Sequence, residues 1–157
     1  MAHQYGPAIE YLQKSLELEP NHTDGHRGLG ETYVQKGMYD EAIASMQEYF
    51  DLTEGRTDYA VGYLGYAYGM AGQRDKALQL LETLHDRAKR QQVAPYAFAP
   101  LYMGLGDYDK AIEALWQDYE QRATPFLLWL NVFPVLDPLH SDPRFTELVR
   151  RIGVEPE

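Results

Sequence analysis

One arrangement of histidines in the sequence has a spacing that suits a metal ion. His22 and His26 stand four residues apart with Asp24 between them, and such a pair binds zinc when its rings share a helix face and a third ligand converges. Here the pair spans a predicted turn and the start of a helix, so the rings need not share a face. Asp24 also suits a helix N-terminus, where the dipole favours negative charge. We therefore predict no metal ligands and no cofactor.

The residue types that catalysis requires are present without a catalytic arrangement. The sequence has no Gly-x-Ser-x-Gly elbow, no phosphate-binding glycine-rich loop and no His-Glu-x-x-His motif. It has no cysteine, which excludes a thiol nucleophile and a disulfide framework. Four glycines fall in one predicted helix rather than in a strand-to-helix turn, and we interpret them as close helix contacts: Gly62, Gly65, Gly69 and Gly72. We predict no catalytic residues and no enzyme.

Tyrosine is the unusual residue type, at 13 of 157 residues. A predicted helix over 58–71 has two apolar stripes at helical spacing. Its core stripe is Ala60, Leu64, Tyr68 and Ala71. Its second stripe, on nearly the opposite side, is Tyr59, Tyr63, Tyr66 and Met70. A helix that is apolar on two faces must bury the second face, against a partner or against another part of its own chain.

Length and composition exclude several classes of protein. A chain of 157 residues with 45% hydrophobic residues supports a sizeable core and is too apolar to be disordered, even at a net charge of −10. Acidic residues outnumber basic ones 24 to 14, which argues against nucleic-acid binding, because phosphates require a basic face. No apolar run approaches the ~20 residues of a membrane span, and Met1 opens no signal peptide. We expect a soluble cytoplasmic protein without membrane insertion.

The elements that position these residues follow from an internal repeat. Four segments share a Tyr or Arg, two further residues, an Ala, and then Ile or Leu. Their alanines, Ala8, Ala42, Ala77 and Ala111, are 34, 35 and 34 residues apart. Three copies carry a glycine two residues before the Tyr or Arg, where a first helix would end: Gly37, Gly72 and Gly106. A fixed period of this length is typical of stacked helix pairs, in which a small residue allows the two helices of a pair to cross closely.

With these residues the sequence resembles the tetratricopeptide repeat family, whose unit is a helix–turn–helix of about 34 residues. The resemblance implies an all-α, right-handed solenoid of antiparallel helix pairs. We expect about three and a half repeats plus C-terminal capping helices in a single domain over 1–157. Its divisions are a half repeat over 4–20, repeats over 23–56, 58–91 and 92–123, and a cap over 124–157. The helices are expected at 5–18, 23–36, 39–53, 58–71, 74–89, 95–105, 108–121, 125–132 and 142–152.

The N-terminal helix and the tail carry two further interpretations. The sequence opens inside a repeat, so it is a fragment of a longer protein or helix 5–18 serves as its own cap; a bare flank there suits a homodimer. The tail, with Leu136-Asp137-Pro138-Leu139 and then Ser141-Asp142-Pro143-Arg144-Phe145, is similar to the closing segment of bacterial signalling and regulatory proteins. In those proteins a tetratricopeptide array follows a winged-helix regulator, a nucleotide cyclase or a kinase, although His140 replaces a common Arg. The last helix should pack as a lid through Phe145, Leu148, Val149 and Ile152.

The resemblance also implies a binding surface, because the first helix of each pair lines a concave groove in such arrays. The matching positions are Arg27, Glu31, Gln35, Tyr59, Tyr63, Tyr66, Met70, Tyr96 and Met103. The positions equivalent to a carboxylate clamp hold one cation and no Asn, so that mode of peptide binding is not expected. Pro100 should kink helix 95–105 and leave the carbonyl of Tyr96 without its helical donor.

The resulting prediction is a non-catalytic protein–protein interaction module that binds a peptide or a partner protein in an aromatic concave groove. Three alternatives stay open. The tyrosines pack against a helix of their own chain, for example in the tail. The chain is instead a self-association element, or it is a small-molecule sensor with a pocket closed between groove and tail.

Overall fold

The computed structural model describes residues 5–153, and these residues form helices, turns and no strand. A single helix comes first, α1 (Tyr5–Leu18). Three helix pairs follow: α2 (Thr23–Gln35) with α3 (Tyr39–Leu52), α4 (Asp58–Met70) with α5 (Arg74–Ala88), and α6 (Phe98–Leu105) with α7 (Tyr108–Gln121). A 3-10 turn, η1 (Pro95–Ala97), precedes α6. The C-terminal part consists of the 3-10 turns η2 (Pro125–Trp129) and η3 (Pro134–Leu139) and of α8 (Pro143–Ile152). The predicted all-α, right-handed solenoid is confirmed.

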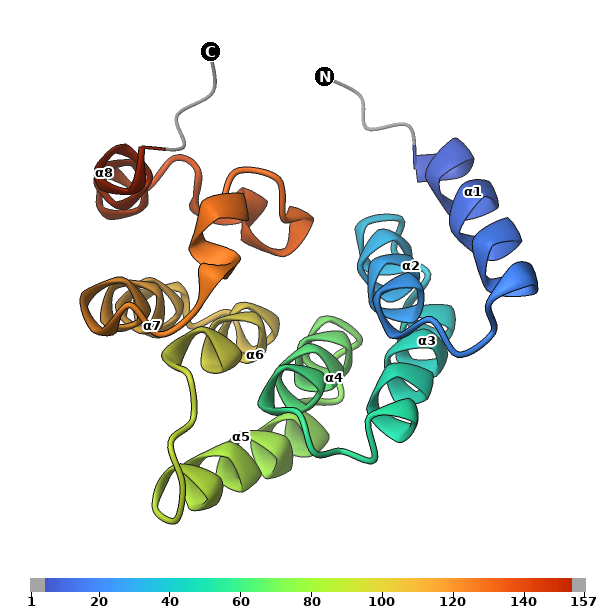
Figure 1. Ribbon diagram of the computed structural model, residues 1–157, viewed down its shortest axis with the longest axis horizontal. Coiled ribbons are helices and arrows are strands. Elements are labelled where there is room, and N and C mark those ends of the chain that lie inside the picture. Colours follow the sequence, from blue (N-terminus) through green and yellow to red (C-terminus); the bar gives the residue numbers. More distant parts are fainter. Residues whose placement is uncertain (1–4, 154–157) are drawn as a thin grey trace.

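The helices follow one another along an arc (Figure 1). Helices α2 and α3, α4 and α5, and α6 and α7 form the successive pairs, and α4 packs on both α3 and α6. The repeat alanines explain how the pairs close, because Ala42, Ala77 and Ala111 are fully buried. The glycines before them end the first helices in the left-handed conformation, with φ of 73° at Gly37 and 74° at Gly106.

Helices α4 and α6 approach until their backbones touch. A Cβ atom on Gly62 would lie 2.1 Å from the carbonyl oxygen of Ala97, and one on Gly69 would lie 2.4 Å from the backbone of Gly104. The interpretation of these two glycines as close helix contacts is therefore confirmed. Gly72 differs, because nothing lies within 4 Å of its Cβ position and its φ of 76° shows that it ends the helix.

Two of the expected helices do not form as predicted, and both ranges contain proline. In place of one helix over 95–105, the chain makes the turn η1 and then starts α6 at Phe98. Pro100 therefore sits in the first turn of α6, where its missing N–H costs no helical hydrogen bond, and not in the interior of a longer helix that it would kink. The carbonyl of Tyr96 lacks a donor from Pro100, as expected, and the N–H of Phe98 at the end of η1 takes that place. In place of a helix over 125–132, the chain forms the proline-led turn η2, and η3 follows after this range.

The C-terminal segment, as we call residues 125–139, lies on the inner side of the arc (Figure 1). Its turn η3 contacts α2 and α6, and η2 contacts α7. The side chains that it buries are Leu127, Leu130, Val135, Leu136 and Leu139. Helix α8 follows, with Asp142 accepting the backbone N–H of Arg144 at 2.8 Å as its N-cap. As predicted, α8 packs on the core through Phe145, Leu148, Val149 and the half-buried Ile152.

Candidate functional site

Five aromatic rings meet where the C-terminal segment crosses the concave side. Tyr59 and Tyr63 come from α4, Tyr96 from η1, and Phe126 and Phe133 from the C-terminal segment. We call these five residues the aromatic cluster. Phe126 contacts Tyr59 edge-on at 4.9 Å between ring centroids and stacks on Tyr96 at 5.4 Å, while Phe133 lies 6.2 Å from Tyr96. These separations are those of favourable aromatic pairs, so the two phenylalanines anchor the segment to α4 and η1.

Two tyrosines of the cluster are joined beneath the phenylalanines. The hydroxyl oxygens of Tyr63 and Tyr96 lie 3.1 Å apart, and the two residues are 2% and 1% exposed. Burial raises the pKa of the Tyr63 phenol well above its ordinary value. Burial, together with the charge of Asp118, raises the pKa of Tyr59 to about 12. At neutral pH these phenols are uncharged and serve as hydrogen-bonding groups.

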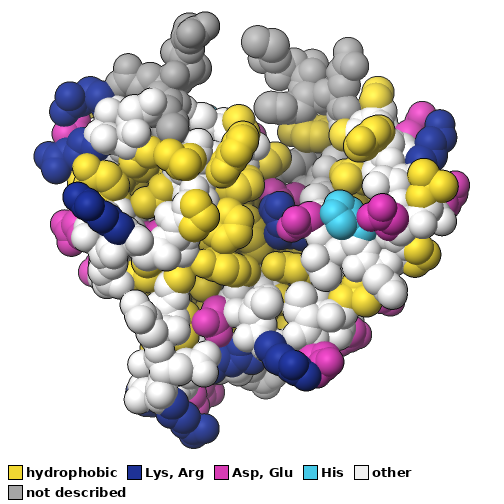
Figure 2. Space-filling model, in the orientation of Figure 1, with side chains coloured by type: hydrophobic (Ala, Val, Ile, Leu, Met, Phe, Trp, Pro, Cys, Tyr) yellow, Lys and Arg dark blue, Asp and Glu magenta, His cyan; other side chains and the backbone are white. Residues whose placement is uncertain are grey.

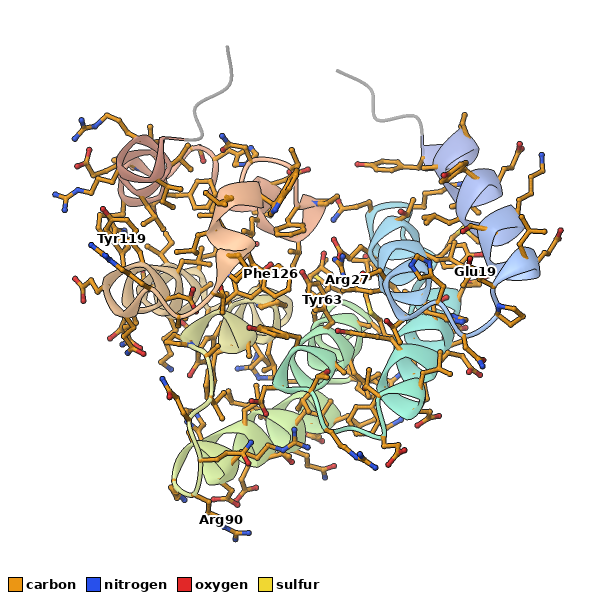
Figure 3. The ribbon with its side chains drawn as sticks, in the orientation of Figure 1. Glu19, Arg27, Tyr63, Arg90, Tyr119 and Phe126 are labelled. Carbon is orange, nitrogen blue, oxygen red and sulfur yellow. The ribbon has the colours of Figure 1, made fainter. Side chains whose placement is uncertain are left out.

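A cation from α2 lies over the cluster. The guanidinium carbon of Arg27 is 5.4 Å from the centroid of Tyr63 and 5.7 Å from that of Phe133, within the range of a cation–π contact. Figure 3 shows Arg27, Tyr63 and Phe126 gathered on the inner side of the arc. The guanidinium donates to the carboxylate of Glu31, one turn further along α2. Burial raises the pKa of Glu31 above its ordinary value, although the charge of Arg27 acts to lower it.

Gln35 ties α2 to both α4 and the C-terminal segment. Its Nε2 amide donates to the hydroxyl of Tyr66 and to the backbone carbonyl of Pro134, each at 3.2 Å. A side-chain amide that recognises a main-chain carbonyl is a common element of peptide binding, because it reads the backbone rather than a particular side chain. The C-terminal segment is thus held by ring contacts and by a backbone hydrogen bond.

Comparison with known families identifies this arrangement. Two family models, each described as tetratricopeptide repeat, match residues 1–61 and residues 63–88. The chain belongs to the tetratricopeptide repeat family. Repeats of this family generally mediate protein–protein interactions and are typically non-catalytic. A search of curated proteins finds no match to the chain.

The residues expected to line the tetratricopeptide groove are largely brought together, but most of them are covered. Tyr63, Tyr66, Tyr96 and Met103 are at most 3% exposed, and Glu31 is 3% exposed. Arg27, Gln35 and Tyr59 are half-buried, and Met70 lies at the exposed end of α4. The buried members are therefore covered by their own chain, which is one of the alternatives that the sequence left open.

Asp118 of α7 is a buried residue that the sequence reasoning missed. Its side chain is fully buried, and its carboxylate accepts the backbone N–H of Tyr96 at 3.0 Å and the hydroxyl of Thr124 at 2.7 Å. It thereby fixes the turn η1 and the start of the C-terminal segment to the last helix of the repeats. A signal was present in the sequence, because Asp118 follows Ala111 by seven residues on the core face of the helix.

The tetratricopeptide groove leaves little space for a small ligand. The cavity beside the cluster measures about 30 Å³, which is room for about one water molecule rather than for a metabolite. Among residues 5–153, no three metal-ligating side chains converge. His26 instead donates from Nε2 to the carbonyl of Pro20 at 2.7 Å. Within the same described range, no helix combines the length and apolar character that crossing a membrane requires.

Proposed function

We propose that this chain is a non-catalytic interaction module whose concave aromatic groove binds a peptide or a partner protein. The observation that supports the proposal is the C-terminal segment itself, which lies in the groove as a peptide ligand would. Phe126 and Phe133 are its anchors, and the carbonyl of Pro134 is its backbone contact with Gln35. A few aromatic anchors commonly carry most of the energy of such interfaces.

The same observation defines what a partner must offer. It needs two aromatic side chains to replace Phe126 and Phe133 in the cluster, and a free backbone carbonyl for Gln35. Because the segment is tethered, its effective concentration is high, and an external peptide binds only to the fraction of molecules whose groove is vacated. An acidic group on the partner suits Arg27. A cytoplasmic setting and a place as the docking arm of a larger bacterial signalling protein, suggested by the tail, belong to the same proposal.

The test uses a fluorescent peptide with the sequence of residues 124–140 and measures its anisotropy with the full chain. The wild type is compared with the double variant Phe126→Ala, Phe133→Ala, whose own segment has lost both anchors. We expect the variant to bind the peptide at least tenfold more tightly than the wild type does. Trp129→Ala is the matched control, because Trp129 belongs to the same segment but is 58% exposed; it should bind like the wild type.

The contrary outcome is equally clear. If the double variant keeps its helical circular dichroism and still does not bind the peptide, the cluster is only a folding core and the groove is not a binding site. If the double variant loses its helices, the milder pair Phe126→Leu, Phe133→Leu keeps apolar volume and repeats the comparison. A control peptide with alanine in place of Phe126 and Phe133 should bind neither the wild type nor the double variant.

A further inference from the structure

The most exposed large apolar side chains of the described residues belong to α1 and to the C-terminal segment. Leu18 and Tyr11 of α1 are 85% and 74% exposed, and Val132, Leu128 and Trp129 of the C-terminal segment are 63%, 58% and 58% exposed. The exposed large apolar side chains between them reach 36–45%. Apolar exposure of this kind is typical of an interface. Figure 2 shows apolar side chains gathered over the middle of the face in view, with charged side chains around them.

The outer face of α1 is apolar and acidic. Tyr11 and Leu18 are seven residues apart, which places them on one face about 10 Å from each other along the helix. Glu10 and Glu17 lie beside them with the same spacing, are exposed, and form no ion pair with the described residues. Lys14 offsets one of these charges. We call this face the α1 stripe.

The opposite end carries a hollow of about 510 Å³ between the end of α7, η2 and α8. Its apolar lining includes Leu127, Leu128 and Ile152, and its charged lining is Arg122, Arg151 and Glu120. Arg151 pairs with Glu147 at 2.8 Å, whereas Arg122 is exposed and forms no ion pair with the described residues. We call this site the C-terminal hollow. With Arg151 paired, Arg122 is the cation of this lining that remains for an acidic group of a second molecule.

The two surfaces are complementary in character but cannot meet within one molecule. Glu19, which directly follows α1, and Tyr119, which lines the C-terminal hollow, lie on opposite sides of the molecule in Figure 3. We propose that the α1 stripe of one copy docks into the C-terminal hollow of a second copy, with Tyr11 or Leu18 against Leu128 and Glu17 toward Arg122. The contact is heterologous, so a dimer still has one stripe and one hollow unused, and association continues unless a ring closes.

The test is sedimentation of the full chain over a range of concentrations, with one variant for each surface. Tyr11→Ser, Leu18→Ser blocks the stripe, and Leu128→Ser, Arg122→Ser blocks the hollow, because Leu128 and Arg122 both line it. These side chains are all exposed, so the fold should persist. We expect the wild-type mass to rise beyond that of a dimer, each variant alone to associate at least tenfold more weakly, and an equimolar mixture of the two to form dimers that grow no further. Leu78→Ser, at a 41% exposed position outside both surfaces, should behave like the wild type.

Several results would overturn the proposal. A wild type that stays monomeric at high concentration excludes it. If the hollow variant still dimerises while the stripe variant does not, the contact is stripe to stripe. If both variants associate like the wild type, another surface is responsible, such as exchange of C-terminal segments between copies. Added salt should weaken the proposed association, because Glu17 and Arg122 contribute charge attraction at an exposed rim.

Discussion

The hydroxyl oxygens of Tyr63 and Tyr96 lie 3.1 Å apart in a fully buried position. This single hydrogen bond joins α4, the first helix of one pair, to the turn that precedes the first helix of the next pair. One hydroxyl donates and the other accepts, in a place that solvent does not reach. The bond therefore fixes the floor on which the phenylalanines of the C-terminal segment rest.

Replacing both tyrosines by phenylalanine should cost less unfolding free energy than the sum of the two single replacements. Tyr63→Phe or Tyr96→Phe leaves one buried hydroxyl without this partner, which costs about 1–3 kcal/mol of unfolding free energy. The double variant removes both hydroxyls and should lose less than the sum of the two single losses. Urea denaturation of the four proteins in a double-mutant cycle measures the coupling. A strictly additive cycle would show that the two hydroxyls do not depend on each other.

Asp118 should tolerate asparagine better than alanine. In Asp118→Asn the amide keeps an acceptor for the N–H of Tyr96 and can donate to Thr124, whose hydroxyl turns to accept. Asp118→Ala leaves the N–H of Tyr96 buried without this acceptor, and a loss of about 2–4 kcal/mol is expected. Thr124→Val should fall between them, since it removes one hydroxyl donor from the carboxylate. Thermal unfolding of the three variants tests this order, and an asparagine variant as unstable as the alanine variant would contradict it.

A methyl group on Gly62 should separate α4 from the turn η1 that leads into α6. Its Cβ would meet the carbonyl oxygen of Ala97 at 2.1 Å, and backbone atoms cannot rotate away as a side chain can. We expect Gly62→Ala to lower the unfolding free energy by about 1–3 kcal/mol or more. The matched control is Gly6→Ala in α1, where nothing lies within 4 Å; it should gain up to about 1 kcal/mol. Chemical denaturation compares the two, and equal effects would refute the close contact.

The buried carboxylate of Glu31 should give stability an identifiable pH dependence. Its pKa is raised in the folded chain by burial, so the folded state holds this proton at pH values where the unfolded state has lost it. The contribution of Glu31 is therefore most favourable below its ordinary pKa of about 4.5 and declines as pH rises through the folded value. The wild-type stability minus that of Glu31→Gln should fall over this window by at most about 1.4 kcal/mol per pH unit. Subtracting the stability of Glu31→Gln removes the contributions of the other titrating groups. A stability difference that rises with pH would show that the pKa of Glu31 is not raised on folding.

Much of the fold could be predicted because its signals are local and repeated. The span of α1 from Tyr5 to Leu18 and that of α7 from Tyr108 to Gln121 agree with the expected 5–18 and 108–121. The phased alanines and glycines determine where such helices cross and end. The two errors, over 95–105 and 125–132, both involve prolines. Which of the possible turns forms around a proline depends on what the flanking residues pack against, which the periodicity does not contain.

The candidate site could be predicted only in part. The second apolar stripe of helix 58–71 had to be buried against another surface, and its residues were identified from their helical spacing. The identity of the cover was left open, because Phe126 and Phe133 lie far along the chain in a segment without helical periodicity. A partner or the chain itself would satisfy the same stripe. Asp118, in contrast, was visible as an acidic residue on a core face and could have been found.

The hydrogen bond from Gln35 to the carbonyl of Pro134 has a mechanical consequence. In an open solenoid each repeat contacts only its neighbours, so stability is local and the end repeats can unfold first. Such a superhelix can also be extended elastically. Here the C-terminal segment spans the arc from α6 to α2 and acts as a chord across it. Opening the arc requires the chord to be released first. The array should therefore resist extension and unfold as one cooperative unit instead of repeat by repeat.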